Sequence, residues 1–420
     1  MKKYLNDTVK SIQKLIKIDS TNAPAQDGMP FGKGAADALN TFLSLAQSFG
    51  FVTNNYDNYV GEVIFGDGEE FAVLAHLDVV PAGSGWSHEP FGAEIVDGKI
   101  YGRGTMDDKG PAVICLYALK ALKDEGFLPN KRIKLIVGCN EESGSACIAH
   151  YKKCAVMPKY GFTPDADFPV IYAEKGILGV KFNFNVKNAP FTALFGGTAG
   201  NMVCAEAFAV CEHYDGYEPF KLVKIDDGFK SLGVSAHGST PEKGVNALDN
   251  LLKFFAEKNS DVKNAYEILF ADKYHLKDFN DSTGNLTFSP NIAKYENGVL
   301  SVWVDIRYPA TIEKQVILNA LNSTGVDYQI IAHQNALYND KNGFLISTLN
   351  RVYCEETGEN AQPIAIGGGT YARSLECGAG FGPQLLSEPS TIHQADEYIS
   401  ISHVEFLLKV YKKAIYELTK

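Results

Sequence analysis

The chain has 420 residues, which is enough for two or three domains of ordinary size and a large core without disulfide support. Hydrophobic residues make up 45% and charged residues 21% of it, values that exclude disordered and collagen-like proteins. The formal net charge of -11 argues against nucleic acid or an anionic membrane as the main partner.

The first part of the chain alternates helical and strand-like patterns. Apolar residues between 5 and 16 recur at helical spacing, and further helices are predicted at 35–49, 111–125 and 145–153. Continuous apolar runs at 71–75 and 133–137 predict strands that are buried on both faces. Buried strands separated by helices indicate an α/β sheet covered on both sides.

The pattern changes at about Gly176. Residues 180–186 alternate between apolar and polar side chains, and similar strands are predicted at 286–288 and 299–307, with helices at 244–257 and 312–321. After about residue 337 the pattern indicates a helix at 344–357, a short strand at 363–366 and a closing helix at 403–418. We therefore expect one discontinuous domain, residues 1–175 and 337–420, interrupted by an α+β domain, residues 176–336.

The eight cysteines are scattered and include no CxxC pair, so we expect reduced thiols rather than a disulfide framework or a zinc finger. No apolar run approaches the length of a membrane span, and the first residues lack the features of a secretion signal. These features predict a cytoplasmic protein.

Three motifs of the first domain carry polar side chains next to predicted strands and helices. His76 and Asp78 follow the strand at 71–75 with a spacing of two, so both side chains can point to one place at the strand's carboxyl end. A glycine-rich segment before a helix contains Asp107 and its neighbour Asp108, and the pair Glu141-Glu142 follows the strand at 133–137. Each motif has an ordinary alternative: a polar pair at a strand end, a helix cap or a solvated acidic loop.

Two downstream motifs add Asp165, in a proline-bounded turn, and His393, just before the closing helix. The combined candidates, with Asp78 and Glu141 in support, are His76, Asp107, Glu142, Asp165 and His393. Nitrogen and oxygen ligands without sulfur suit Zn²⁺, Mn²⁺ or Co²⁺ in an open catalytic site. Two such metals about 3.5–4 Å apart, bridged by a carboxylate, form a hydrolytic centre. Asp107 would be the bridge, Asp78 would orient His76, and one glutamate of the pair could act as general base while the other binds metal.

Five segments of the chain resemble the co-catalytic zinc family of aminoacylase, carboxypeptidase G and succinyl-diaminopimelate desuccinylase. The resemblance is strongest to its bacterial PepV and carnosinase-like Xaa-His dipeptidase branch, and it runs from about Ile16 to the last helix. It implies a catalytic domain with a mixed central sheet flanked by helices, and an inserted α+β lid domain. The segments are His-Leu-Asp-Val-Val-Pro (76–81), Gly-Arg-Gly-Thr-Met-Asp-Asp-Lys-Gly (102–110), Glu-Glu-Ser-Gly (141–144), Pro-Asp-Ala-Asp-Phe-Pro (164–169) and His-Gln-Ala-Asp-Glu (393–397).

The resemblance also implies roles for single residues in the first domain. Asp107, rather than Asp108, would bridge the metals. Glu141 would be the general base and Glu142 a ligand, while Asp165 would bind metal.

Further roles follow for the lid and for a glycine-rich loop. His237 would stabilise the oxyanion, Asn201 would contact the substrate, and Arg307 would grip the substrate carboxylate together with the loop at Gly369 and Thr370. Alternatives are a helix cap for His237, a surface ion pair for Arg307 and a turn for Asn201. The related dipeptidases tend to have proline where this chain has Cys204, so details of the lid differ.

The resemblance predicts a metallo-dipeptidase with two divalent metal ions, Zn²⁺ before Mn²⁺ or Co²⁺, that hydrolyses dipeptides with a free C-terminal carboxylate. An N-acyl amino acid deacylase or desuccinylase is the alternative within the same chemistry. A non-catalytic metal-binding scaffold is a remote alternative, because it would have no use for the Glu141-Glu142 pair. We expect a small peptide substrate, no nucleic acid or membrane partner, and a monomer, with a dimer as the alternative.

Overall fold

The computed structural model describes residues 1–420, which divide into two compact units. Unit 1 contains Met1–Tyr172, Asn339–Ile364 and Gly369–Lys420, and unit 2 contains Ala173–Tyr338 and Ala365–Gly368. The sequence pattern predicts the two main domain boundaries after residues 175 and 336. In the structure, the chain passes from unit 1 to unit 2 after residue 172 and returns to unit 1 after residue 338.

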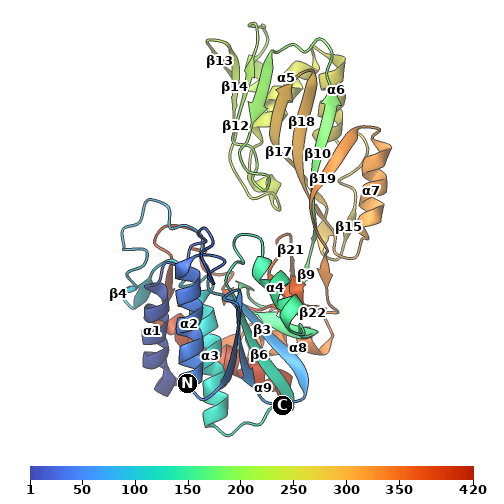
Figure 1. The fold of residues 1–420 in the computed structure, drawn as a ribbon. Coiled ribbons are helices and arrows are strands. Elements are labelled where there is room, and N and C mark those ends of the chain that lie inside the picture. Colours follow the sequence, from blue (N-terminus) through green and yellow to red (C-terminus); the bar gives the residue numbers. More distant parts are fainter. The chain divides into compact units, whose positions relative to one another are not determined.

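Unit 1 is built on a mixed sheet (Figure 1). In spatial order its strands include β1 (Val52–Tyr56), β2 (Val60–Phe65), β6 (Lys131–Gly138), β3 (Glu69–His76), β7 (Tyr160–Thr163) and β22 (Cys377–Gly380). β3 runs parallel to β6 on one side and to β7 on the other, while β2 is antiparallel to both β1 and β6.

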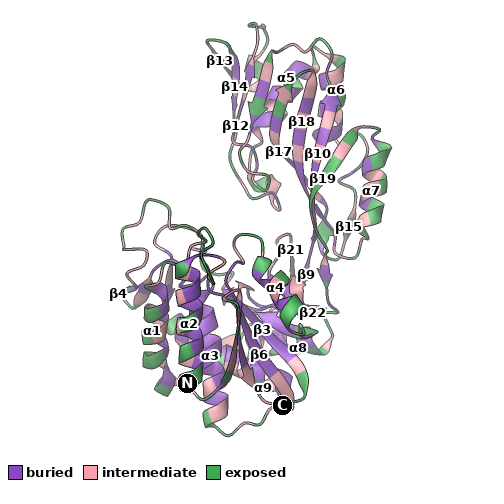
Figure 2. Cartoon of the chain, in the orientation of Figure 1, coloured by how far each residue is buried: buried purple, intermediate pink, exposed green.

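The central strands of this sheet are buried on both faces. The last six residues of β3 and of β6 are all buried, as Figure 2 shows for both strands. Helices cover the two faces: Gly61 lies against Leu39 and Leu43 of one helix, and Gly138, on the opposite face, approaches Cys147 of another. The helices of unit 1 are α1 (Lys2–Ile16), α2 (Lys33–Ser48), α3 (Lys109–Asp124), α4 (Ala146–Cys154), α8 (Phe344–Thr357) and α9 (Ile401–Thr419).

Shorter elements complete unit 1 and the chain segments that connect it to unit 2. They are β4 (Glu94–Val96), β5 (Lys99–Tyr101), β8 (Ala166–Asp167), β9 (Ile171–Glu174), β20 (Leu337–Tyr338), β21 (Ile364–Ile366), η3 (Tyr371–Ser374), β23 (Pro383–Gln384) and β24 (Tyr398–Ser400).

Unit 2 contains a fully antiparallel eight-stranded sheet. Its strand β10 (Gly176–Asn185) alternates between buried and partly exposed residues, as expected for a sheet that packs on one face only. In spatial order the strands are β13 (Leu222–Ile225), β14 (Gly228–Leu232), β12 (Glu206–Val210), β11 (Ala193–Gly196), β17 (Thr287–Glu296), β18 (Val299–Tyr308), β10 (Gly176–Asn185) and β19 (Asp327–Gln334). The remaining elements are η1 (Glu218–Phe220), η2 (Pro241–Lys243), α5 (Ala247–Ala256), α6 (Ser260–Leu269), β15 (Asn280–Asp281), β16 (Gly284–Asn285) and α7 (Lys314–Ser323).

Two helices of unit 2 differ from the sequence prediction. The helix expected at 244–257 begins at Ala247, because the side chain of Asn246 accepts a hydrogen bond from the Leu248 N–H and caps it. The helix α6 was not predicted. Asn259 caps it in the same way, and its apolar residues, among them Val262 and Ile268, are buried in the core of unit 2.

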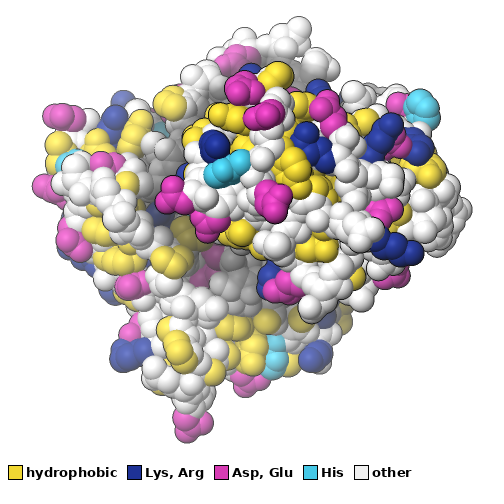
Figure 3. Space-filling model, turned by 90° about the horizontal axis from the view of Figure 1, so that it is seen from above, with side chains coloured by type: hydrophobic (Ala, Val, Ile, Leu, Met, Phe, Trp, Pro, Cys, Tyr) yellow, Lys and Arg dark blue, Asp and Glu magenta, His cyan; other side chains and the backbone are white.

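None of the helices is both long enough and apolar enough to span a membrane. On the face of the molecule seen in Figure 3, Lys and Arg side chains are interspersed with Asp and Glu side chains. The negative net charge is therefore not gathered into one patch on that face.

Candidate active site

Three neighbouring strands of unit 1 end at the same edge of its sheet. In the order β6-β3-β7 they are parallel, so their carboxyl ends face the same way. Glu141 and Glu142 follow β6, His76 is the last residue of β3, and Asp165 follows β7. Ligands of open α/β sheets bind at this edge, and four of the predicted site residues gather there.

Asp107 and His393 reach the same place from other parts of the chain. Asp107 lies just before α3, and His393 lies in the loop before β24. The Oδ1 atom of Asp107 is 2.9 Å from His76 Nε2, and its Oδ2 atom is 2.8 Å from His393 Nε2. The two oxygens of one carboxylate therefore face two different imidazoles.

Two groups of three potential ligands share Asp107. The first is His76, Asp107 and Asp165, and the second is Asp107, Glu142 and His393; within each, the ligand atoms lie within 4.8 Å of one another. His76 Nε2 is 3.6 Å from Asp165 Oδ2, and His393 Nε2 is 2.9 Å from Glu142 Oε1. Tetrahedral sites with metal bonds of about 2.0–2.1 Å hold their ligands about 3.3 Å apart, a value that these separations bracket. The residues present thus fit divalent cations, and Asp107 belongs to both groups of potential ligands.

In this arrangement protons supply the positive charge that holds the carboxylates together. Burial by itself would lower the pKa of His76, but hydrogen bonds with carboxylates, led by Asp107, raise it well above its usual value. Hydrogen bonds with Asp107 and Glu142 raise the pKa of His393 to about 10. Burial would raise the pKa of Asp107, but hydrogen bonds with the two histidines outweigh burial and lower that pKa. Both imidazoles are therefore protonated near neutral pH.

Glu141 has the chemistry expected of a group that exchanges protons. Its burial, together with repulsion from carboxylates that include Asp165 and Glu142, raises its pKa to about 8, although the charge of His76 opposes this shift. Positive charge placed among these carboxylates would lower the pKa again, because it stabilises the ionised form.

Asp78 holds the segment that carries the two glutamates. Its Oδ1 accepts a hydrogen bond from the Glu141 N–H at 3.0 Å, and its Oδ2 accepts one from the Glu142 N–H at 3.1 Å. His76 Nδ1 lies 3.0 Å from the backbone oxygen of Asp78 and 3.5 Å from its carboxylate. Asp78 was predicted to orient the His76 ring, and the contact that does so is mainly the one from its backbone carbonyl.

The acidic residue next to Asp107 does not act as a helix cap. Asp108 occupies the N-cap position of α3, but its side chain makes no capping hydrogen bond. Its Oδ2 instead accepts a hydrogen bond from the backbone N–H of His76 at 3.1 Å. Asp108 thereby ties the Asp107 loop to the end of β3.

Sequence reasoning missed the role of Glu397, although the residue belongs to one of the quoted motifs. Its buried Oε1 accepts hydrogen bonds from the backbone N–H groups of Gly104 and Met106, at 3.1 and 2.9 Å. Its Oε2 accepts one from Arg103 Nη1 at 2.7 Å. Glu397 therefore fixes the loop that presents Asp107, and its place four residues after His393 was the available signal.

The predicted oxyanion residue, His237, belongs to unit 2. Its Nδ1 accepts a hydrogen bond from the backbone N–H of Ser239 at 3.2 Å. Burial and the nearby charge of Arg307 lower its pKa, although Asp305 opposes the shift. A neutral ring whose Nδ1 accepts carries its proton on Nε2, so His237 can donate one hydrogen bond.

The predicted carboxylate-binding residues are divided between the units. Arg307 lies in unit 2, where its Nε and Nη2 each donate to Asp305 at 2.8 Å, and its Nη1 donates to the backbone oxygen of Gly367 at 3.0 Å. These three bonds leave two of the five guanidinium N–H donors. Gly369 and Thr370 lie in unit 1, and the Thr370 side chain accepts a hydrogen bond from the Ala372 N–H.

Asn201, the predicted substrate contact, lies in unit 2 and is exposed. Its backbone oxygen accepts a hydrogen bond from the Gly238 N–H at 2.7 Å, next to His237. Asn201 and His237 thus belong to one hydrogen-bonded loop region of that unit.

Comparison with known proteins places this site in a family. Residues 72–417 match the family model of Peptidase family M20/M25/M40. The Beta-Ala-Xaa dipeptidase of Lactobacillus delbrueckii subsp. lactis is 34% identical, over 98% of this chain and 96% of that protein.

Solved structures show the same fold at lower sequence identity. Aminopeptidase PepT from Bacillus cereus ATCC 10987 superposes with a TM-score of 0.61 at 15% identity, over 99% of each chain. Human carnosine dipeptidase 1 superposes with a TM-score of 0.60 at 14% identity, over 99% of this chain and 96% of that one. The expected fold class, a mixed sheet flanked by helices with a second α+β unit, is confirmed. The predicted family is confirmed as well, and with it a hydrolase of peptide bonds: the chain belongs to Peptidase family M20/M25/M40.

Proposed function

We propose that this chain is a dinuclear metal-dependent dipeptidase that hydrolyses the amide bond of dipeptides with a free C-terminal carboxylate. The observation that carries the proposal is the sharing of Asp107, whose two oxygens face His76 and His393, beside the carboxyl group of Glu141. The dipeptidase named above, similar over almost its whole length, supports the substrate class.

Five residues of unit 1 would hold the cations: His76, Asp107, Glu142, Asp165 and His393. Two divalent cations would supply Lewis acidity and an activated water, and Zn²⁺ suits this set of nitrogen and oxygen ligands. Glu141 would take a proton from the attacking water and return it to the leaving amine.

Residues of unit 2 would act on the same substrate. This part of the proposal is based on the sequence motifs that contain His237 and Arg307. His237 would donate from Nε2 to the scissile carbonyl oxygen as negative charge develops on it. The two remaining N–H donors of Arg307 would bind the C-terminal carboxylate, a task that suits a planar guanidinium. The N–H groups at Gly369 and Thr370 would assist.

The test is hydrolysis of a dipeptide panel by protein loaded with Zn²⁺, Mn²⁺ or Co²⁺, with metal content measured on the same samples. We expect about two metal ions per chain at the candidate active site and turnover of dipeptides. C-terminally amidated dipeptides should be poor substrates, because they lack the carboxylate. Faster hydrolysis of N-acetyl or N-succinyl amino acids would instead identify a deacylase, and loaded protein without either activity would overturn the proposal.

A further inference from the structure

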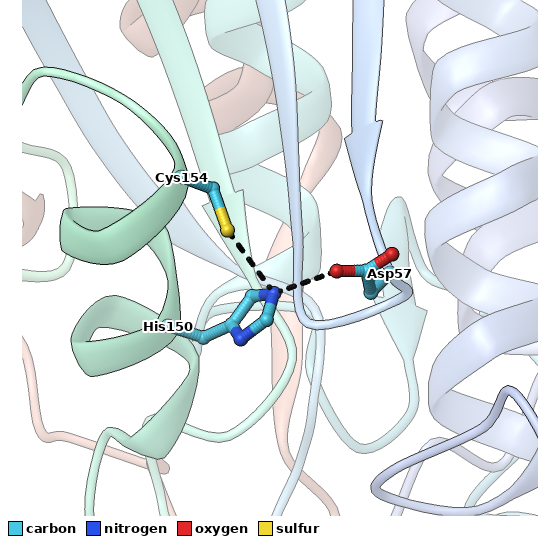
Figure 4. Close-up of side chains that lie close together, drawn as sticks. All are labelled: Asp57, His150 and Cys154. Carbon is cyan, nitrogen blue, oxygen red and sulfur yellow. Dashed lines mark hydrogen bonds and ion pairs between the residues drawn. The ribbon is translucent and has the colours of Figure 1, made fainter.

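A second cluster of potential metal ligands lies on the surface of unit 1, outside the candidate active site. It consists of Asp57, His150 and Cys154 (Figure 4). Asp57 belongs to the turn between β1 and β2, and the other two residues lie at the end of α4. None of the three has a part in the proposed dipeptidase mechanism.

The side chains of Asp57 and Cys154 both contact one ring nitrogen of His150. His150 Nε2 lies 2.9 Å from Asp57 Oδ2 and 3.5 Å from Cys154 Sγ. A nucleophilic relay would need the carboxylate and the thiol on opposite nitrogens of the imidazole. Here both groups contact Nε2, which excludes that relay. Three ligand atoms this close together are instead typical of a metal-binding site.

Local structure holds the ligands in position. His150 and Cys154 are four residues apart on α4, so they share one face of the helix. The ring of Tyr59 stacks on that of His150, with centroids 4.1 Å apart. Asp57 lies in a tight turn closed by a 2.9 Å hydrogen bond from the Tyr59 N–H to the Tyr56 oxygen. The backbone that carries the three ligands and the ring of His150 are therefore held in place before a metal binds.

The two separations from His150 Nε2 are close to those that a tetrahedral cation requires. Zinc bonds of about 2.3 Å to sulfur and about 2.0 Å to nitrogen and oxygen require N–S and N–O separations of about 3.5 and 3.3 Å. The N–S distance of 3.5 Å meets this value. The N–O distance of 2.9 Å must open by a few tenths of an ångström, and the Asp57 side chain, 76% exposed, is free to move that far.

The chemistry of the donors narrows the choice of ion. One thiolate with one imidazole and one carboxylate favours Zn²⁺ and related borderline metals over Mg²⁺ or Ca²⁺, which prefer all-oxygen sites. The carboxyl end of α4 adds a partial negative charge, while the exposed Lys152 and Lys153 on its last turn weaken the attraction for a cation.

We propose that Asp57, His150 and Cys154 form a binding site for Zn²⁺ or a related thiophilic divalent cation, with solvent as the fourth ligand. On binding, the bond between Cys154 Sγ and the metal forms while the thiol proton passes to the buffer. The site is independent of the proposed dipeptidase function, since it shares no ligand with the candidate active site.

Co²⁺ distinguishes this site from the active site, because only a thiolate ligand produces sulfur-to-cobalt charge-transfer absorption, and the active-site ligands include no sulfur. The reduced full chain titrated with Co²⁺ should show this absorption, and Cys154→Ser should abolish it and bind one Co²⁺ fewer per chain. His150→Gln should weaken the same binding step. Circular dichroism of the metal-free variants checks that they fold.

Cys354→Ser is the matched control, because Cys354 also lies in the last turn of a helix, α8. Its thiol donates to the backbone oxygen of Ala361 and belongs to none of the three groups of potential metal ligands. This variant should keep both the absorption and the metal content of the unmodified chain. Absence of the absorption at saturating Co²⁺, its survival in Cys154→Ser, or a dissociation constant above about 1 mM would overturn the proposal.

Discussion

Asp107 shows how one side chain can organise a whole site. Its two oxygens lie 2.9 Å from His76 Nε2 and 2.8 Å from His393 Nε2, so the single carboxylate joins two ligand groups. In the absence of cations the imidazoles are positively charged and balance the surrounding carboxylates. Bound cations would replace the protons on the imidazoles as the source of positive charge. The release of these protons should therefore accompany metal binding.

Metal binding at pH 7 should release protons. The pKa of His393 is raised to about 10 and that of His76 well above its usual value, so both rings are protonated at pH 7. A metal binds only the neutral ring, so loading both sites should release about two protons or more per chain, and affinity should rise with pH up to about 10. A pH indicator in weakly buffered solution measures the release. Loading without any release would show that the two imidazoles are not ligands.

Replacement of Glu141 should separate catalysis from metal binding. Glu141→Gln removes the proton-accepting oxygen but keeps the size of the side chain, so turnover of dipeptides should fall by about 10²–10⁴-fold at unchanged metal content. Steady-state kinetics and metal analysis on one sample measure both quantities. Glu69→Gln, at an exposed position of β3, is the control and should behave like the unmodified chain. Near-normal turnover of Glu141→Gln would exclude this residue as the base.

At the scale of elements, sequence patterns predicted best what local periodicity determines. The helix expected at 344–357 has those bounds in α8, and the strands expected at 71–75 and 133–137 form the inner parts of β3 and β6. Short strands such as β11 and β12 were not predicted, because their four and five residues carry too little pattern without their antiparallel partners.

The candidate site was predictable as a set of residues but not as a geometry. Polar groups after predicted buried strands identified His76 and the Glu141-Glu142 pair as candidates for one site. Asp165 was a candidate only through its motif, because the strand that precedes it, β7, was not predicted. The hydrogen bonds of Glu397 to the Asp107 loop join residues about 290 positions apart, and no local pattern reports such a contact. The sequence likewise does not indicate which oxygen of Asp107 faces His76 and which faces His393.

Loss of the Glu397 charge should loosen the Asp107 loop. Glu397→Gln leaves Arg103, which is 2% exposed, without its ionic partner, and this should lower the free energy of unfolding by about 3 kcal/mol. Metal affinity should fall too, since the loop presents Asp107, which both groups of potential ligands share. Thermal unfolding and metal titration measure the two effects.

Glu376→Gln provides the matched control for this substitution. Its ion pair with Lys159 is about 70% exposed on both sides, so its loss should cost less than about 1 kcal/mol. Equal stability and metal affinity of Glu397→Gln and Glu376→Gln would contradict the anchoring role of Glu397.

At the scale of the whole molecule, the five metal-ligand candidates and Glu141 all belong to unit 1, whereas His237 and Arg307 belong to unit 2. Metal binding and substrate hydrolysis should therefore respond differently to changes in unit 2. Arg307→Lys tests this division in the full chain, because lysine keeps a positive charge beside Asp305 but cannot bind a carboxylate through two parallel N–H groups. Metal content should stay unchanged while kcat/KM for dipeptides falls by about 10²-fold, mainly through KM.

Removal of residues 173–338, which form nearly all of unit 2, tests the same division more directly. The Asn339 N–H donates to the Tyr172 oxygen at 2.9 Å, so a short Gly-Ser linker can join these residues in place of 173–338. The shortened chain should bind as many metal ions as the full chain, because it keeps every ligand candidate. It should not turn over dipeptides, because it lacks His237 and Arg307. Metal analysis and the dipeptide assay measure both properties, and circular dichroism checks folding. Hydrolysis at the rate of the full chain would show that unit 1 contains the complete catalytic machinery.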